Sequence, residues 1–129
     1  MTVGTLAREL VSIPSHDDPT AAGDRIADWL REHTPATVTR DEAGNVVARR
    51  NVGAGPSLAL VGHHDVVPPD EAQLAGDGSG EYVVERRDGR LFGRGAADMK
   101  GAVAAMLHAM RDADPAGELV VASFVAEEQ

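Results

Sequence analysis

Residues 57–62 read Ser-Leu-Ala-Leu-Val-Gly, a nearly continuous apolar run that ends directly before His63. A run of this length and character is typical of a strand that is buried on both faces, and not of an exposed edge strand. A second apolar segment, rich in β-branched residues, spans 118–126. Between the two strands lies a helical pattern, so the chain is expected to form an α/β fold.

The remaining elements follow from apolar spacing and turn residues. Helical periodicity predicts a helix over 3–13, a second helix that begins near the capping residues 17–20 and has Trp29 in the core, and a third over 99–112. Short segments joined by turn residues predict hairpins at 37–50 and 82–92. Hydrophobic residues make up 43% of the 129 residues, which is enough for the core of one ordinary domain.

Composition excludes several classes of function. A net charge of -9, with aromatic residues at 3%, argues against nucleic acid, which is bound through clustered basic and stacking side chains. No apolar stretch approaches the roughly 20 residues that span a bilayer, so no membrane partner is expected. With no cysteine, only histidine, aspartate and glutamate are available as metal ligands. We expect a soluble cytoplasmic protein.

Histidine and carboxylate groups stand where predicted strands and turns end: His63-His64-Asp65, Asp98 and Glu127-Glu128. The carboxyl ends of strands are where α/β sheets bind ligands. His63 and Asp65 lie two residues apart and point the same way in an extended strand. Both can ligate a metal, or His63 can ligate while Asp65 holds its other ring nitrogen. Alternatively they form an ordinary hydrogen-bonded pair at a strand end.

The two later groups leave similar alternatives. Asp98 precedes a predicted helix, so it either caps that helix or supplies a carboxylate that bridges two metal ions. Glu127 and Glu128 end a strand, where one can be a metal ligand and the other a general base, or both can be solvated. The other histidines, His16, His33 and His108, are expected at the surface.

Two longer segments resemble the signatures of a known di-zinc hydrolase family. They are 60–68 (Leu-Val-Gly-His-His-Asp-Val-Val-Pro) and 93–101 (Gly-Arg-Gly-Ala-Ala-Asp-Met-Lys-Gly), and the strand ending at 126–128 resembles the third segment of the family. The family includes succinyl-diaminopimelate desuccinylase, acetylornithine deacetylase and aminoacylase. The resemblance implies the N-terminal portion of a zinc-exopeptidase-like catalytic domain, with a mixed, largely parallel sheet flanked by helices.

The resemblance also implies roles for individual residues. His63 would bind one metal ion, Glu128 the other, and Asp98 would bridge them through a turn whose Asp98–Met99 peptide is cis. Glu127 would be the general base, and Asp65 would support His63. The two metal ions would be zinc, although cobalt and manganese also suit such ligands.

For a complete protein, the implied reaction is hydrolysis of an N-acyl amide, either an N-succinyl or N-acetyl amino acid or a short peptide. Residues 1–129 would be a partial catalytic domain, without the C-terminal part of the family's catalytic domain and without its lid and dimerisation domain. Full-length members often form homodimers through that second domain. The isolated chain is therefore expected to be inactive. Two alternatives are a dinuclear phosphoesterase that uses Arg94 and Lys100, and a non-catalytic truncated remnant.

Overall fold

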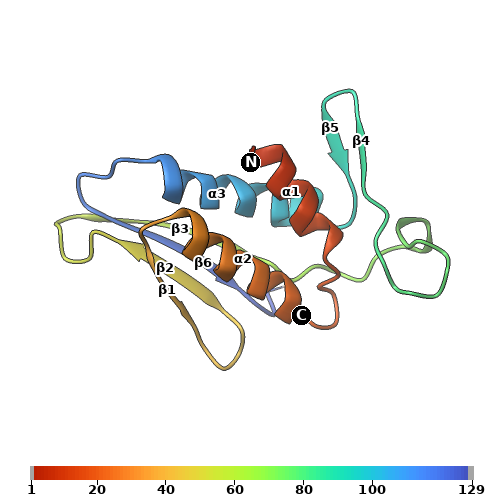
Figure 1. The fold of residues 1–129 in the computed structure, drawn as a ribbon. Coiled ribbons are helices and arrows are strands. Elements are labelled where there is room, and N and C mark those ends of the chain that lie inside the picture. The colour runs from red at the N-terminus through yellow and green to blue at the C-terminus, as the bar shows by residue number, and fades with distance from the viewer. Residues whose placement is uncertain (1, 128–129) are drawn as a thin grey trace.

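The computed structural model describes residues 2–127, which fold into helices packed on a sheet (Figure 1). The α-helices are α1 (Val3–Ser12), α2 (Thr20–His33) and α3 (Gly101–Asp112). The main sheet contains β1 (Thr37–Arg40), β2 (Val46–Arg50), β3 (Ser57–His63) and β6 (Glu118–Phe124), and a separate hairpin contains β4 (Glu85–Arg87) and β5 (Arg90–Phe92). Both predicted hairpins and all three predicted helices are present.

The main sheet is mixed, with the strand order β1-β2-β6-β3. Strands β3 and β6 are parallel, with Ser57 opposite Glu118 and His63 opposite Phe124. The β1–β2 and β2–β6 pairings are antiparallel. The expected mixed α/β sheet is confirmed, although within residues 2–127 its antiparallel pairings outnumber the parallel one. Helix α3 provides the crossover between β3 and β6, as a parallel pair requires.

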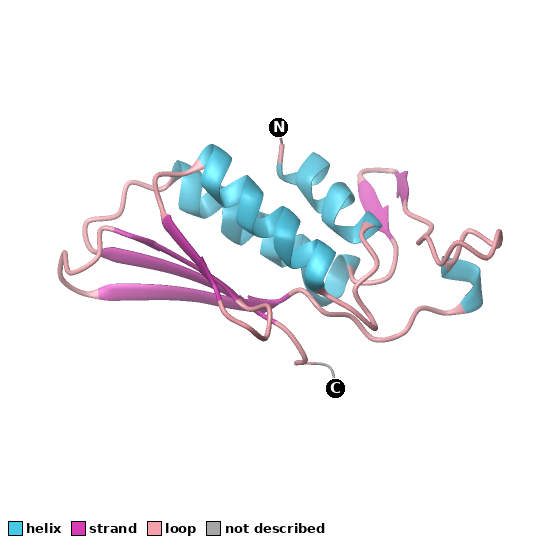
Figure 2. Cartoon of the chain, turned by 60° about the horizontal axis from the view of Figure 1, so that its bottom comes forward, coloured by secondary structure: helices cyan, strands magenta, loops and turns pink. Residues whose placement is uncertain are grey.

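The three helices cover one face of this sheet, as Figures 1 and 2 show from two directions. Their apolar stripes meet inward-facing strand residues in a continuous core. Trp29 of α2 is fully buried there, as predicted. The buried core residues include Leu6, Leu10, Ile26, Trp29, Val46, Val103, Leu107 and Val121.

Strand β3 differs from the prediction because it lies at the edge of the described sheet and not between two strands. Its neighbour on one side is β6, and the helices cover only one sheet face. Leu58 and Val61 are consequently 60% and 57% exposed. The expectation of burial on both faces is wrong for residues 2–127, because an apolar run predicts a strand without specifying which elements cover it.

Helix α3 begins at Gly101, two residues later than predicted. Asp98 (φ -127°, ψ 89°) and Met99 (φ -142°, ψ 33°) have non-helical backbone angles within the turn 96–100. This turn keeps Asp98 outside the regular helix. No helix among residues 2–127 combines the length and the apolar character needed to cross a bilayer.

Candidate metal centre

The parallel pairing of β3 with β6 brings the predicted site residues together at the carboxyl ends of these two strands. His63 is the last residue of β3 and lies opposite Phe124, the last residue of β6. The residues that follow β6 therefore emerge beside His63. Because α3 enters from the same end of the strands, the turn that carries Asp98 joins them there.

His63 is the centre of this cluster. Its Nε2 lies 2.9 Å from Oδ1 of Asp98 and 3.7 Å from Oε2 of Glu127. On the other side of the ring, Nδ1 lies 2.9 Å from the carbonyl oxygen of Asp65 and 3.3 Å from Oδ1 of the same residue. One imidazole nitrogen thus faces two carboxylates, while the other is held by Asp65.

The surroundings of His63 favour its protonated form. Burial by itself lowers the pKa of the His63 imidazole. The backbone hydrogen bond to Asp65 and the carboxylates of Asp98 and Asp65 outweigh burial, so the pKa of His63 is raised above its usual value. Anionic groups that raise the pKa of an imidazole also attract a cation to the same place. His63 and Asp65 are buried, whereas the Asp98 side chain is 69% exposed, so the cluster opens to solvent on the Asp98 side.

The turn before Asp98 has a glycine where a side chain would collide. Gly95 has φ +85°, and a Cβ on it would lie 2.6 Å from Cγ1 of Val66. The turn can therefore pack directly against the segment that follows His63. The Asp98–Met99 peptide is cis, as the resemblance implies. Asp98 contacts His63, and the N-cap residue of α3 is Lys100 and not Asp98, so the structure does not favour the helix-cap alternative.

Glu127 reaches this cluster, but the other member of its pair, Glu128, lies outside the described residues. Of the three predicted metal ligands, His63 and Asp98 are therefore in contact within residues 2–127. No group of three or more potential ligands in this part of the chain is arranged to hold a metal ion.

His64 faces the opposite way, into the layer beneath α2. It is fully buried, and its Nδ1 lies 2.8 Å from the hydroxyl oxygen of Ser123. Burial, reinforced by the positive charge of Arg40, lowers its pKa to about 4, so the ring is neutral at pH 7. Gly23 provides the space for it, because a Cβ there would lie 3.0 Å from Nε2 of His64.

Lys100 and His108 are two buried groups whose environments the sequence did not predict. The side chain of Lys100 is fully buried, and its Nζ donates a hydrogen bond of 2.6 Å to the carbonyl of Ile13. It is therefore not presented to a phosphate, which removes support from the phosphoesterase alternative. His108 was expected at the surface but is 5% exposed, because its ring packs 5.0 Å from that of Trp29.

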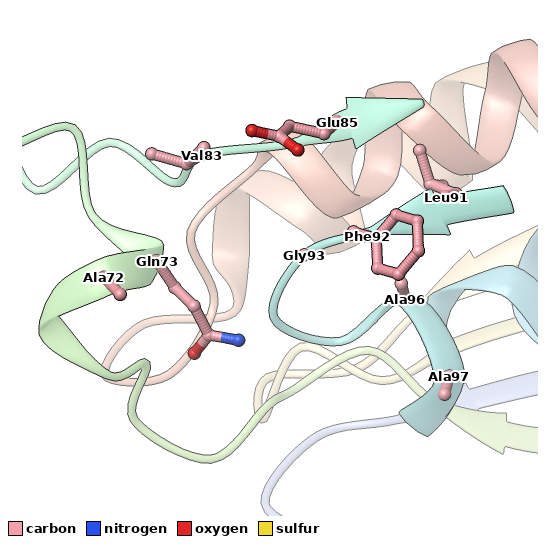
Figure 3. A pocket seen from close by; sticks show the side chains of 9 residues that line it. All are labelled: Ala72, Gln73, Val83, Glu85, Leu91, Phe92, Gly93, Ala96 and Ala97. Atoms are coloured by element: carbon pink, nitrogen blue, oxygen red, sulfur yellow. The ribbon is translucent and has the colours of Figure 1, made fainter. Parts of the chain in front are cut away.

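A cavity of about 450 Å³ opens between the short helical turn Glu71–Gln73 and the β4–β5 hairpin (Figure 3). Its lining is mainly apolar, and Glu85 is the carboxylate within it. The lining reaches Ala97 but includes neither His63 nor Glu127. The cavity is therefore a neighbour of the candidate metal centre and not part of it.

A mixed sheet covered by helices, with histidine and carboxylates gathered at its strand ends, defines the class as an α/β domain with a polar cluster at the carboxyl ends of its parallel strands. Residues 59–129 match peptidase family M20/M25/M40, and the chain belongs to this family. The family membership implied by the sequence segments is thereby confirmed.

Two relatives illustrate the similarity in sequence. A protein of Pyrobaculum aerophilum assigned as a LysW-lysine/LysW-ornithine hydrolase is 38% identical over 99% of this chain and 34% of its own length. Succinyl-diaminopimelate desuccinylase of Bordetella petrii is 37% identical over 83% of this chain and 28% of its own length. The chain thus spans about a third of the length of the relatives that it matches.

Solved structures share the fold. An M20 family metallo-carboxypeptidase from Sulfolobus solfataricus superimposes with a TM-score of 0.82 at 19% identity, over 99% of this chain and 31% of that protein. Human carnosine dipeptidase 1 gives a TM-score of 0.79 at 23% identity, over 98% of this chain and 32% of that protein. At these identities the likeness concerns the fold alone.

Proposed function

We propose that the complete protein hydrolyses the amide bond of an N-acyl amino acid or a short peptide with the help of two divalent metal ions. The observation that carries this proposal is the convergence of Asp98 and Glu127 on Nε2 of His63, at 2.9 and 3.7 Å. Membership of the peptidase family and a desuccinylase among the relatives support the same reaction class.

The donor set suits the metal ions. Imidazole nitrogen and carboxylate oxygen are ligands for zinc, and they also accept cobalt and manganese. We assign His63 to one metal ion, Glu128 to the other and Asp98 to a position between them. Asp65 would hold Nδ1 of His63, which directs Nε2 toward the metal and strengthens it as a donor. When bound, the metal ions polarise the substrate carbonyl and lower the pKa of water.

Glu127 is our candidate for the general base. Its carboxylate is near His63 without being one of the three proposed ligands, so it is available to take a proton from the attacking water. The same carboxylate would then hold that proton and donate it to the leaving amine. Protonation of the amine is needed because an unprotonated amide nitrogen is a poor leaving group.

Two metal ions need more ligands than His63, Asp98 and Glu128 provide, since zinc sites usually use three or four each. The relatives are about three times as long as this chain. We therefore propose that further ligands, a lid and a dimerisation domain belong to the complete enzyme, and that residues 1–129 alone bind metal weakly without turnover. We propose an N-succinyl or N-acetyl amino acid as the preferred substrate.

The first test is metal binding by this chain, measured by calorimetry and by the visible absorption of cobalt. His63→Ala and Asp98→Asn should each weaken binding by at least about 10-fold, which is the lower end of what loss of an outer-shell partner costs, because each changes a proposed ligand. Asp114→Asn is the matched control, because it removes an exposed aspartate between the end of α3 and the start of β6, at the opposite ends of both elements from Asp98 and Glu127. Equal metal affinity in all four proteins would contradict the assignment.

The second test is activity of the complete protein loaded with zinc, cobalt or manganese. Substrates should include an N-succinyl amino acid, an N-acetyl amino acid, a dipeptide and a phosphate ester. We expect amide hydrolysis, with a loss of about 100-fold or more in Glu127→Gln. Hydrolysis of the phosphate ester alone would overturn the proposal in favour of a phosphoesterase.

A further inference from the structure

The end of strand β6 is held from two sides just before the chain reaches Glu127. The carbonyl of Phe124 accepts a hydrogen bond of 3.1 Å from the backbone N–H of His64. The backbone N–H of Val125 donates a hydrogen bond of 2.8 Å to Oδ1 of Asn45. Asn45 lies in the turn between β1 and β2, so a side chain 80 residues away in sequence fixes the end of β6.

Asn45 is itself fixed by Asp41 at the other end of the same turn. Its Nδ2 donates to Oδ2 of Asp41 at 2.8 Å, and Oδ1 of Asp41 accepts the backbone N–H groups of Asn45 and Gly44, both at 2.9 Å. With the donor end of the amide directed to Asp41, the acceptor end faces Val125. The turn is therefore organised to receive that backbone N–H.

The residue after Val125 shows why this attachment matters. Ala126 has φ +60°, a left-handed conformation that is unfavourable for a residue with a side chain. This conformation redirects the chain at the end of β6, and Glu127 then lies with Oε2 3.7 Å from Nε2 of His63. A firm hold on the preceding residue stabilises a turn that Ala126 by itself disfavours.

We propose that Asn45 is a positioning residue, which through Val125 and Ala126 determines where the carboxylate of Glu127 stands beside His63. The inference rests on the proposed role of Glu127 as general base. Asn45 touches neither substrate nor metal in this scheme. Its contribution is to keep the base within proton-transfer distance of the attacking water, where a displacement of about 1 Å costs on the order of 100-fold in rate.

The decisive comparison is Asn45→Ala against Asn51→Ala in the complete protein. Asn51 also binds backbone near β6, since its Nδ2 donates to the carbonyls of Pro115 and Gly117 at 3.0 and 3.4 Å. It lies at the opposite end of the strand from Glu127. Both variants remove side-chain hydrogen bonds to backbone near β6, and Asn51→Ala in addition places alanine at φ +56°, so it is the more disruptive change to the backbone. Only Asn45→Ala releases the segment that carries the base.

We expect kcat to fall by about 10- to 100-fold in Asn45→Ala and to stay within about twofold in Asn51→Ala. Because Glu128, a proposed metal ligand, directly follows Glu127 in the sequence, both variants are assayed at a saturating concentration of metal. In a Glu127→Gln background, Asn45→Ala should cause no further loss, because both changes act through one carboxylate. An equal loss in Asn51→Ala, or a further loss in the Glu127→Gln background, would overturn the inference.

Crystal structures of the wild-type protein and both variants separate this inference from the proposed function. Displacement of Glu127 from His63 in Asn45→Ala but not in Asn51→Ala supports the positioning role even if no amide is hydrolysed. An unmoved Glu127 in Asn45→Ala refutes it even if the enzyme is active. If Asn45→Ala does not fold, Asp41→Asn replaces it, because this change weakens the hydrogen bonds that hold the Asn45 amide. Asp41→Asn should displace Glu127 in the same way. An unmoved Glu127 in Asp41→Asn also refutes the positioning role.

Discussion

Replacing Lys100 by methionine should change the pH dependence of stability in a defined direction. Lys100 is the one lysine in the sequence, its side chain is fully buried, and burial lowers its pKa from 10.5 to about 7. Its Nζ donates a hydrogen bond to the carbonyl of Ile13. Methionine keeps a long flexible side chain but removes both the charge and this hydrogen bond.

The direction in which stability changes with pH follows from how strongly the folded and unfolded states bind the Lys100 proton. Between pH 7 and 10.5 the unfolded chain holds a proton on Lys100 and the folded chain does not, so the stability of the wild-type protein rises with pH over this range. A difference of this size between the two pKa values corresponds to about 5 kcal/mol. That cost is present in full below pH 7 and disappears above pH 10.5.

The variant loses about 1 to 3 kcal/mol at every pH, because the carbonyl of Ile13 is left without its donor. Lys100→Met should therefore be more stable than the wild type by about 2 to 4 kcal/mol at pH 6, and less stable above about pH 10. The difference should change sign near pH 9. Groups common to both proteins cancel in this comparison.

Urea denaturation at several pH values between 6 and 10 measures this difference. NMR of the single lysine side chain in the folded protein reports its pKa directly. Arg90→Met is the control, because it removes an exposed cation and should show a pH-independent effect. A stability difference between wild type and Lys100→Met that is constant with pH would show that Lys100 is charged in the folded state, and would refute the reasoning.

Two further predictions concern packing and acid stability. Gly117→Ala places a Cβ 2.1 Å from the backbone oxygen of Pro56 and should cost about 1 to 3 kcal/mol or more in urea denaturation. Gly4→Ala is the control, because a Cβ there would lie 3.4 Å from the Arg86 side chain, an ordinary contact; an equal cost in both variants would contradict the clash at Gly117. The unfolded chain binds a proton on His64 near pH 6.5, whereas the folded protein binds it only near pH 4, so His64 lowers the stability of the wild-type protein as the pH falls from 6.5 to 4. His64→Gln removes this contribution and should make the loss of stability over that range smaller by roughly 3 kcal/mol. The same acid dependence in both proteins would show that His64 does not titrate in this way.

Local patterns predicted most elements because each is encoded within its own segment. Apolar spacing in 3–13 and the turn residues of 82–92 require no knowledge of the rest of the chain, and both elements form. The strand predicted over 57–62 forms as Ser57–His63, but its surroundings were not predicted. Its exposure depends on which strands and helices lie beside it, and periodicity does not encode that information.

In the candidate site, too, some residues were predicted from the sequence and others depend on tertiary contacts. His63, Asp98 and Glu127 were singled out because they follow apolar runs or glycine turns and together resemble a family signature. Lys100 was considered for phosphate binding, yet the structure buries it against Ile13. Asn45 was interpreted only as part of a hairpin, because its contact with Val125 joins residues far apart in the chain.

The sequence by itself thus determined the order of helices and strands, and the residue types at their ends, since both depend on neighbours along the chain. The tertiary structure decided which of those ends meet. The parallel register of β3 with β6 sets His63 beside the segment that carries Glu127, and the β1–β2 turn holds that segment in place. Such contacts arise when packing of the core aligns separate elements, and only then do isolated histidine and carboxylate groups share one site.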